Sequence, residues 1–405
     1  MSVETHLRMA RFLADPYAAY SQLRAHDPVH WNAGFKCWTV TRHSDIVRIL
    51  SDPAASSARQ EPPGLLRPGG VRAEAVRAAA GTVHERLARW LIRLDPPAHT
   101  RLRALLTSAM TRSTVVALTP GVRLKAQQLI EAARLHGGMD LISEFASPLV
   151  LHCIASLIGL PEADHPRFKG WSDDIGAFAQ GEPDAPTVVR AERSLQEVTS
   201  YLDESIRQRR DRAQPDLLTR LLVPRRDGDI LSNDEIIDTS ALLLLAGHET
   251  TAHAIANAAS LIFKHPELRQ LMTGDRDSVE QAIDEVLRFN TPLLGVLRQA
   301  RNDLTVGEKR IERGHNILLW LAAGNHDETR FEKAGSFDPR RARNRHLAFG
   351  HGSHACIGAR LARVTIEVAT RTLLESAPRI QLASDASVWQ GNALFRCLRA
   401  LPVRL

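Results

Sequence analysis

The stretch from Ser232 to Phe263 constrains the fold of this chain most. Ser232 is followed three residues later by Glu235, which is the pattern of a capping box at the start of a helix, and no proline interrupts the sequence before Phe263. At 1.5 Å per residue the pattern predicts a helix about 45 Å long. Its middle, LLLLAGHETTAHA, is apolar on nearly every side. We therefore expect this helix to cross the protein core.

Polar side chains lie within this apolar helix. Glu249 and Thr250 follow Gly247, and burial of such groups costs free energy unless a partner satisfies them. From these residues alone two interpretations are open: Thr250 bonds back to a carbonyl one turn earlier and Glu249 pairs with an arginine, or both groups serve chemistry. A zinc-protease helix is excluded, because His248 and His253 are five residues apart and therefore about 140° apart around a helix, not four residues apart on one face.

A second constraint is the run FGHGSHACIGAR, which begins at Phe349 and contains Cys356. Its glycines, Gly350, Gly352 and Gly358, allow tight turns and let the backbone approach a flat cofactor without a Cβ in the way. Cysteine binds metal as the thiolate, and a thiolate on haem iron favours cleavage of an O–O bond. A small buried cysteine at a loop–helix junction is the alternative interpretation.

Composition is that of an ordinary globular protein. The 405 residues are 44% hydrophobic and 24% charged, and no low-complexity linker or obvious repeat divides them, so we expect one domain over residues 1–405. The four cysteines contain no C-x-x-C pair, as expected in a reducing compartment. We take Ala241 to Gly247 as the longest candidate membrane span, and it is far shorter than the roughly 20 residues a bilayer needs. We expect a cytoplasmic protein with no membrane partner.

The net charge of +6 does not by itself indicate a nucleic-acid partner. The arginines are spread along the chain, and no zinc-knuckle spacing or aromatic–basic RNA-binding motif is present. A basic surface can equally attract an acidic protein. We therefore expect no nucleic acid among the partners.

The cysteine run resembles the haem-binding signature of the cytochrome P-450 family, the haem-thiolate monooxygenases, in its soluble bacterial type. The resemblance extends from Asp15-Pro16-Tyr17 to Leu401-Pro402-Val403. It implies a mainly α fold with a minor β part, with haem between the long central helix and the cysteine-loop helix. Residue periodicity predicts helices at 99–116, 122–135, 147–159, 190–210, 232–263, 277–289 and 356–376, and strands at 35–40, 296–306, 310–319 and 393–403.

The resemblance also implies roles at the haem. Cys356 is implied to be the axial ligand of a non-covalent b-type haem, since no C-x-x-C-H attachment motif occurs. Ala246 and Gly247 are implied to leave room for dioxygen. Thr250 is implied to hydrogen-bond the bound oxygen, and Glu249 to relay protons.

Other residues are implied to hold the cofactor and its loop. The segment from Asp95 resembles the family's Asp-Pro-Pro-x-His-x-x-x-Arg, and the haem propionates need cationic or hydrogen-bonding partners. The implied cofactor-binding residues are His99, Arg103, Arg298, His354, Phe349, Gly350 and Gly358. Glu285 and Arg288 resemble the family's Glu-x-x-Arg, and Arg341 is implied to complete a buried Glu-Arg-Arg network that supports the cysteine loop.

The family's substrate-pocket segments correspond here to 59–90, 168–182, 242–246, 293–296 and 393–395, which are mostly aliphatic. The loop-like stretch 59–82 is implied to cover the pocket. We expect an apolar substrate of terpenoid, steroid, fatty acyl or polyketide type. The expected lining residues are Leu242, Leu245, Ala246, Leu293, Leu294, Val296, Leu394 and Phe395.

Two departures from the family pattern are present. The segment from Asn325 reads Asn-His-Asp-Glu-Thr-Arg-Phe where the family often has Asn-Arg-Asp-Pro, and we expect little effect on chemistry. Cys397 occupies the C-terminal hairpin where glycine is common, which leaves the shape of that turn open.

The implied reaction needs O2 and two electrons from outside, because the chain has no flavin or nicotinamide fingerprint and no cysteine cluster for iron–sulfur. We expect NAD(P)H to supply them through ferredoxin reductase and ferredoxin, to a monomeric enzyme. Arginines around the cysteine loop predict docking of an acidic ferredoxin on the Cys356 side, with an ordinary solvated loop as the alternative. These are Arg340, Arg343, Arg345 and Arg360.

Two other functions are open: a peroxide-driven haem-thiolate peroxygenase, and a haem-binding sensor or carrier that oxidises nothing. The peroxygenase would not need Glu249 and Thr250, so their presence favours O2 activation.

Overall fold

The long helix is present as α13 (Asn233–Lys264), which confirms the prediction for 232–263. Its capping box forms as the sequence suggests: Ser232 N donates to Glu235 Oε2 (2.8 Å), and Glu235 N donates to Ser232 Oγ (3.2 Å). These two bonds satisfy backbone groups that the first helical turn leaves open.

The structure is a computed structural model that describes residues 15–58, 74–180, 183–225, 228–384, 389–391 and 394–405. Its residues form two compact units. The first unit contains the chain up to Ser56, Gly121–Leu149 and Thr250–Leu405, and the second contains Ser57–Pro120 and Val150–Glu249. One domain over residues 1–405 stays a prediction.

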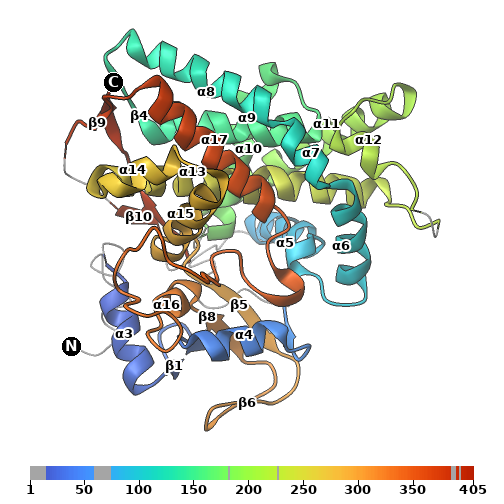
Figure 1. The fold of residues 1–405 in the computed structure, drawn as a ribbon. Helices are drawn as coiled ribbons and strands as arrows, with labels where there is room; N and C mark the ends of the chain where they lie inside the picture. Colours follow the sequence, from blue (N-terminus) through green and yellow to red (C-terminus); the bar gives the residue numbers. More distant parts are fainter. Residues whose placement is uncertain (1–14, 59–73, 181–182, 226–227, 385–388, 392–393) are drawn as a thin grey trace. The chain divides into compact units, whose positions relative to one another are not determined.

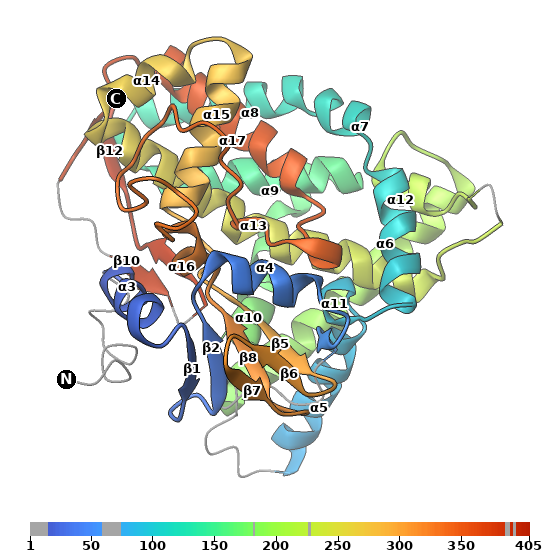
Figure 2. The ribbon, with the colours of Figure 1, turned by 60° about the horizontal axis from the view of Figure 1, so that its bottom comes forward.

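The first unit contains a five-stranded sheet of order β1-β2-β8-β5-β3. Strand β2 pairs in parallel with β8, with Val40 opposite Leu319, and the other neighbours are antiparallel. Figure 2 shows β2, β8 and β5 side by side. The strands are β1 (Val29–Asn32), β2 (Cys37–Val40), β3 (Ala55–Ser56), β5 (Val296–Ala300) and β8 (Asn316–Leu319).

Helix α4 (His43–Ser51) packs on this sheet because its apolar residues recur on one face. Ile46, Ile49 and Leu50 join Val40 and Leu319 in one buried cluster. The first unit further contains α3 (Tyr17–His26), α14 (Pro266–Met272), α15 (Arg276–Phe289), α16 (Leu321–Asn325) and α17 (Ala359–Ser376). Figure 1 shows these helices by label.

Smaller sheets complete the β part of the first unit. One has the order β4-β12-β9, and two hairpins are β6-β7 and β10-β11. Their bounds are β4 (Gly138–Asp140), β6 (Leu304–Val306), β7 (Lys309–Ile311), β9 (Gln381–Leu382), β10 (Trp389–Gly391), β11 (Arg396–Leu398) and β12 (Pro402–Arg404).

The second unit is helical. Helix α10 (His165–Gln180) lies along α11 (Ala185–Asp211), and Trp171 Nε1 donates to Glu197 Oε2 between them (2.8 Å). The others are α5 (Glu74–Ala88), α6 (Ala98–Ala109), α7 (Arg112–Ala117) and α12 (Leu217–Leu221). In three helices the sequence passes from one unit to the other part-way along the helix. These are α8 (Thr119–Arg134), α9 (Ser147–Ile158) and α13. The structure confirms a mainly α fold with a minor β part.

Several predicted boundaries were wrong. The helix expected at 99–116 is two helices, because Thr111 caps α7 by accepting a hydrogen bond from Thr114 N (3.2 Å). The strand expected at 296–306 splits into β5 and β6, with residues 301–303 between them. The strand expected at 310–319 splits into β7 and β8, where Gly314 turns the chain with a φ of +87°. The helix expected from Cys356 begins at Ala359. Helices α3, α4, α5, α10, α12, α14 and α16 have no counterpart among the predicted segments.

The prediction of a loop over residues 59–82 was wrong for residues 74–82, which are helical. Residues 59–73 lie outside the described residues, but α5 begins at Glu74. Its alanines favour helix. Gly81 does not interrupt it, and a Cβ at that position would meet nothing within 4 Å.

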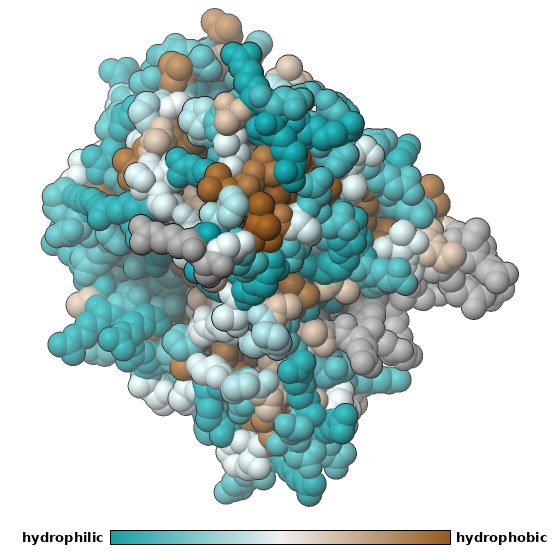
Figure 3. Space-filling model, turned by 90° about the vertical axis from the view of Figure 1, so that its right-hand side faces the viewer, coloured by the Kyte–Doolittle hydropathy of each residue, from teal (hydrophilic) through white to brown (hydrophobic). Residues whose placement is uncertain are grey.

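One helical stretch of the described residues, Leu141–Ile158, is long and apolar enough to span a membrane by length and composition, with 61% of it buried in the protein. The run at 241–247 is therefore not the longest candidate span. Figure 3 shows hydrophilic residues over most of one face, with hydrophobic residues in small groups.

Candidate haem site

The thiol of Cys356 is exposed, whereas those of Cys37 and Cys153 are buried. Cys356 lies in the loop that leads into α17, and its backbone N–H donates to Phe349 O (2.8 Å). That bond closes the loop and fixes the direction of the cysteine. Burial raises the pKa of the Cys37 thiol to about 12, so Cys37 does not supply a thiolate near neutral pH.

The three glycines of the loop meet different structural requirements. Gly350 and Gly352 have φ of +68° and +70°, a region that side chains with a Cβ rarely adopt. A Cβ on Gly352 would also lie 2.6 Å from the carbonyl oxygen of Leu50, at the end of α4. Gly358 has an ordinary φ, and a Cβ there would lie 3.9 Å from Cys356 Sγ. Gly350 and Gly352 therefore shape the loop, whereas Gly358 leaves space beside the sulfur.

Phe349 is held by charged residues that the sequence analysis missed. The guanidinium of Arg363 lies 4.6 Å from the Phe349 ring centroid, and its Nε donates to Asp284 Oδ1 (2.8 Å). His346 Nε2 lies 3.2 Å from the same carboxylate oxygen. Burial alone would raise the pKa of Asp284, but His346 and Arg363 outweigh it and lower that pKa. The one signal in the sequence was the position of His346, three residues before Phe349.

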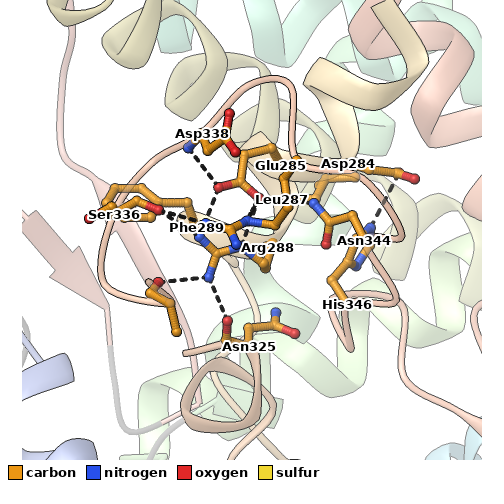
Figure 4. Close-up of polar contacts among 12 residues, drawn as sticks. Asp284, Glu285, Leu287, Arg288, Phe289, Asn325, Ser336, Asp338, Asn344 and His346 are labelled. Carbon is orange, nitrogen blue, oxygen red and sulfur yellow. Dashed lines mark hydrogen bonds and ion pairs between the residues drawn. The ribbon is translucent and has the colours of Figure 1, made fainter. Parts of the chain in front are cut away.

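The structure brings Glu285, Arg288 and Arg341 together in one buried network. Arg288 donates from Nε and Nη2 to the two carboxylate oxygens of Glu285 (2.7 and 2.8 Å), and Arg341 Nε donates to Oε2 (3.0 Å). Glu285 and Arg288 are fully buried. Asp338 N and Asn344 Nδ2 also donate to Glu285 (both 2.9 Å), as Figure 4 shows. The carboxylate thus organises the segment before the cysteine loop.

Arg288 and Asn325 extend this network to backbone groups. Arg288 donates to the carbonyl oxygens of Asn325, Ala334 and Ser336. Asn325 Oδ1 accepts from Leu347 N (2.6 Å), two residues before Phe349. The support of the cysteine loop is therefore continuous from α15 to Phe349.

The structure describes both places at which the sequence departs from the family pattern, the segment from Asn325 and Cys397. His326 is buried, lies 4.1 Å from the ring of Tyr17, and its Nε2 is 3.1 Å from Phe289 O. Cys397 lies in β11, opposite residue 390 of β10.

The four predicted propionate partners lie in different units. Arg298 is buried in β5, and His354 is half-buried two residues before Cys356, both in the first unit. His99 is buried and Arg103 half-buried, one turn apart on α6 in the second unit.

Ala246 is exposed in the middle of α13, although the residues around it are apolar. Leu245, Gly247, Glu249 and Thr250 are half-buried, and Leu242 is buried. A Cβ on Gly247 would lie 2.9 Å from Ile154 Cδ1 of α9. Close packing against α9 therefore also favours glycine at this position.

These observations fit a haem. In the first unit, the exposed Cys356 is a suitable ligand for haem iron. In the second unit, the exposed Ala246 leaves small apolar surface on a helix that is otherwise mostly buried.

Two segments of the predicted substrate wall lie side by side in the first unit. Leu293 and Phe395 form an antiparallel bridge, and Leu294 N donates to Leu394 O (2.7 Å). Leu293, Val296, Leu394 and Phe395 are half-buried, whereas Leu294 is fully buried. Ala393 and residues 59–73, 181 and 182 lie outside the described residues.

The arginines predicted to form the docking face divide into two groups. Arg340, Arg343, Arg345 and Arg360 are exposed, whereas Arg341 is buried in the Glu285 network.

A family model, Cytochrome P-450, matches residues 183–376, which include Cys356. The chain is 31% identical to a cytochrome P-450 of Bacillus subtilis (strain 168), over 99% of this chain and 96% of that protein. The chain belongs to the cytochrome P-450 family. It is also 34% identical to the cytochrome P-450 monooxygenase PikC of Streptomyces venezuelae, over 97% of this chain and 92% of PikC.

The fold agrees with this family. The crystal structure of P450BioI with an acyl carrier protein that carries hexadec-9Z-enoic acid matches with a TM-score of 0.86 and 30% identity, covering 98% of this chain and 100% of that one. The protein is a cytochrome P-450 monooxygenase with a thiolate-ligated haem as its cofactor.

Proposed function

We propose that this cytochrome P-450 inserts one oxygen atom from O2 into an apolar small molecule, with Cys356 as the haem ligand. The bound haem supplies the iron at which O2 is reduced and its O–O bond is cleaved. The observation that carries the proposal is the exposed thiol of Cys356 in a loop fixed by Phe349 O and two glycines of positive φ. No other described cysteine combines exposure with such a loop.

The charged residues would hold the cofactor. His99, Arg103, Arg298 and His354 offer hydrogen-bond donors for the two propionates, whose burial needs such partners. Ala246, Gly247 and Gly358 would provide small surfaces, and Phe349 with Gly350 would pack at the thiolate.

Glu249 and Thr250 would control protons. Both are half-buried neighbours on α13, so the carboxyl of Glu249 can pass a proton from solvent and the hydroxyl of Thr250 can orient it toward the reacting oxygen. A hydroxyl donor at that point favours productive O–O cleavage over release of peroxide.

The substrate wall supports an apolar substrate. Leu293, Val296, Leu394 and Phe395 present aliphatic and aromatic side chains from adjacent segments of the first unit. The P450BioI complex contains a hexadecenoic acyl chain, which agrees with an apolar substrate of fatty acyl, polyketide, terpenoid or steroid type.

Electrons would come from NAD(P)H through ferredoxin reductase and an acidic ferredoxin in the cytoplasm. The exposed arginines Arg340, Arg343, Arg345 and Arg360 support a basic docking face near the cysteine loop.

The test uses the purified holoenzyme. Apolar compounds are titrated against the ferric enzyme, and binders are then assayed for oxygen consumption and product with a ferredoxin system. We expect spectral displacement of water by some compounds and substrate-dependent O2 uptake with stoichiometric oxygenated product. Product formed only with added peroxide would indicate a peroxygenase, and binding without any product would indicate a sensor or carrier; either result contradicts the proposal.

A further inference from the structure

A pair of opposite charges lies beside the cysteine loop, within the first unit. The guanidinium of Arg363, on α17, lies 4.6 Å from the centroid of the Phe349 ring, and its Nε donates to Asp284 Oδ1 on α15 (2.8 Å). The carbonyl oxygen of Phe349 accepts from the backbone N–H of Cys356 (2.8 Å). The charge of Arg363 is therefore held on the residue that binds the backbone of the proposed iron ligand.

The third member of this group, His346, adds no charge. Ala348 N donates to His346 Nδ1 (3.2 Å), so this ring nitrogen has no proton. The Nε2–H of the same ring is then the donor to Asp284 Oδ1 (3.2 Å). The group as a whole contains one guanidinium, one carboxylate and a neutral imidazole that orients the carboxylate.

Water screens the two charges only in part. The side chains of Arg363 and Asp284 are 30% and 22% exposed, and the Phe349 ring covers one side of the guanidinium. In such a setting the effective dielectric constant is well below that of water, so a charge acts over several ångströms. A change of either charge should therefore be felt on the thiolate side of the haem.

Other contacts already fix the backbone of the cysteine loop. Gly350 and Gly352 turn the chain with positive φ. Asn325 Oδ1 accepts from Leu347 N (2.6 Å) and so ties the loop to the Glu285 network. The shape of the loop thus has support that does not involve the charge pair.

Two adjacent carboxylates of α15 have separate partners. Glu285 binds Arg341 in the buried network, whereas Asp284 binds His346, as Figure 4 shows, and Arg363. The first carboxylate organises the segment before the loop. The second is left to balance the charge at Phe349.

We propose that Arg363 is a positioning residue whose charge, held on Phe349, raises the reduction potential of the haem iron, and that Asp284 moderates this effect. The charges of ferric iron, the porphyrin dianion and a thiolate sum to zero, so the electron taken up from outside leaves one negative charge. A nearby cation stabilises that ferrous form, and a carboxylate beside the cation partly cancels the effect. This inference rests on the proposed function, because it requires Cys356 to bind the iron.

The experiment titrates the substrate-free holoenzyme with dithionite and mediator dyes, and it records the Soret band of the reduced carbonyl complex. Arg363→Gln removes the cation and keeps an N–H donor for Asp284, so the potential should fall. At the wild-type midpoint, where ferrous and ferric haem are equal, this variant should have a ferrous-to-ferric ratio of about one third or less. Asp284→Asn removes the opposing charge, so its ratio should rise to about three or more.

Further variants separate charge from packing. Arg363→Lys keeps the cation, so its ratio should stay within about twofold of wild type. The double variant, Arg363→Gln with Asp284→Asn, has neither charge and should lie between the single variants. Glu375→Gln is the matched control, because it breaks the exposed pair with Arg123 near the other end of α17. It should not move the potential, and all variants should keep the red-shifted band.

Opposite shifts are decisive, because loosening of the loop would move both single variants in one direction. The proposal is overturned if Arg363→Gln and Asp284→Asn shift the potential the same way, or if both stay as close to wild type as Glu375→Gln. Loss of the red-shifted band in both also overturns it, since the pair would then only hold the loop.

A variant that loses haem does not end the test. If Arg363→Gln retains none, Asp284→Asn decides alone: a raised potential supports the proposal, and an unchanged or lowered one overturns it. Failure of the proposed function is distinct. There, wild type itself would lack the red-shifted band or would form no product from O2, whatever its potential.

Discussion

Arg341 reaches the buried carboxylate of Glu285 from a segment 56 residues later in the chain, with Nε 3.0 Å from Oε2. The pair joins α15 to the segment that leads into the cysteine loop. Removing one partner leaves the other charge buried without compensation, which costs more than the pair contributes when intact.

We therefore expect Glu285→Gln to lower the free energy of unfolding by about 3–5 kcal/mol, measured by urea denaturation. The matched control is Asp303→Asn, which breaks the exposed pair of Asp303 and Arg310 and should cost below about 1 kcal/mol. Equal, small effects of both variants would show that the Glu285 network does not stabilise the fold.

Cys356→His should abolish the strongly red-shifted Soret band of the reduced carbonyl complex, because that band requires a thiolate ligand. Cys397→Ser should keep the band, since Cys397 lies in a separate hairpin strand. A red-shifted band that persists in Cys356→His would remove this cysteine from the iron.

Thr250→Ala should leave haem content and substrate binding nearly unchanged while diverting reducing equivalents to peroxide, because the hydroxyl that directs protons is missing. The measurement is product and peroxide formed per NAD(P)H consumed. Glu249→Gln should mainly slow turnover. The role proposed for Thr250 fails if its alanine variant gives the wild-type yield of product per NAD(P)H.

Reversal of two exposed arginines, Arg343→Glu with Arg345→Glu, should slow reduction by an acidic ferredoxin several-fold or more at low salt. Reduction by dithionite should not change, because it needs no docking. Screening weakens such steering as salt rises, so the two proteins should converge at high ionic strength. Wild-type rates in the double variant at low salt would place the docking surface elsewhere.

His326 makes the protein sensitive to acid. Burial lowers its pKa to about 3, although the hydrogen bond with Phe289 O opposes this, and an unfolded histidine has a pKa of about 6.5. Between these values the unfolded chain binds the proton and the folded one does not, so stability falls as pH drops from about 6.5 toward 3.

From pH 7.5 to 5.0 this single group should remove about 2 kcal/mol of the free energy of unfolding. His326→Gln should lose correspondingly less over the same interval, in urea titrations at the two pH values. His136→Gln, at an exposed histidine, should follow wild type. Parallel acid losses in wild type and His326→Gln would assign the effect to other groups.

Local patterns explain what the sequence could predict. Helix α13 was predictable because its capping box and its apolar middle are both continuous in sequence. The cysteine loop was predictable as well, since the glycines that shape it lie within a few residues of Cys356. In both cases the information that specifies the structure is adjacent along the chain.

Helix α10 shows why other elements were missed. It contains Gly170 and Gly176, which weaken a helical pattern, and it is stabilised by packing on α11. Trp171 bonds Glu197, and Ser194 bonds Asp174. No short window of the sequence contains both partners.

The residues around Phe349 were missed for the same reason. Asp284, His346 and Arg363 come from three separate segments and meet only in the folded protein.

The parallel pairing of β2 with β8 has a consequence for biosynthesis. Trp38 Nε1 donates to His315 Nδ1 (3.3 Å), and these two residues are 277 positions apart in the sequence. Strand β2 therefore leaves the ribosome long before β8, its parallel neighbour, has been translated. At about 5–20 residues per second, that interval is tens of seconds. During this time the Val40 strand is an open edge that other chains can pair with. The sheet closes only after β8 has been translated, and Cys356 is added to the chain later still.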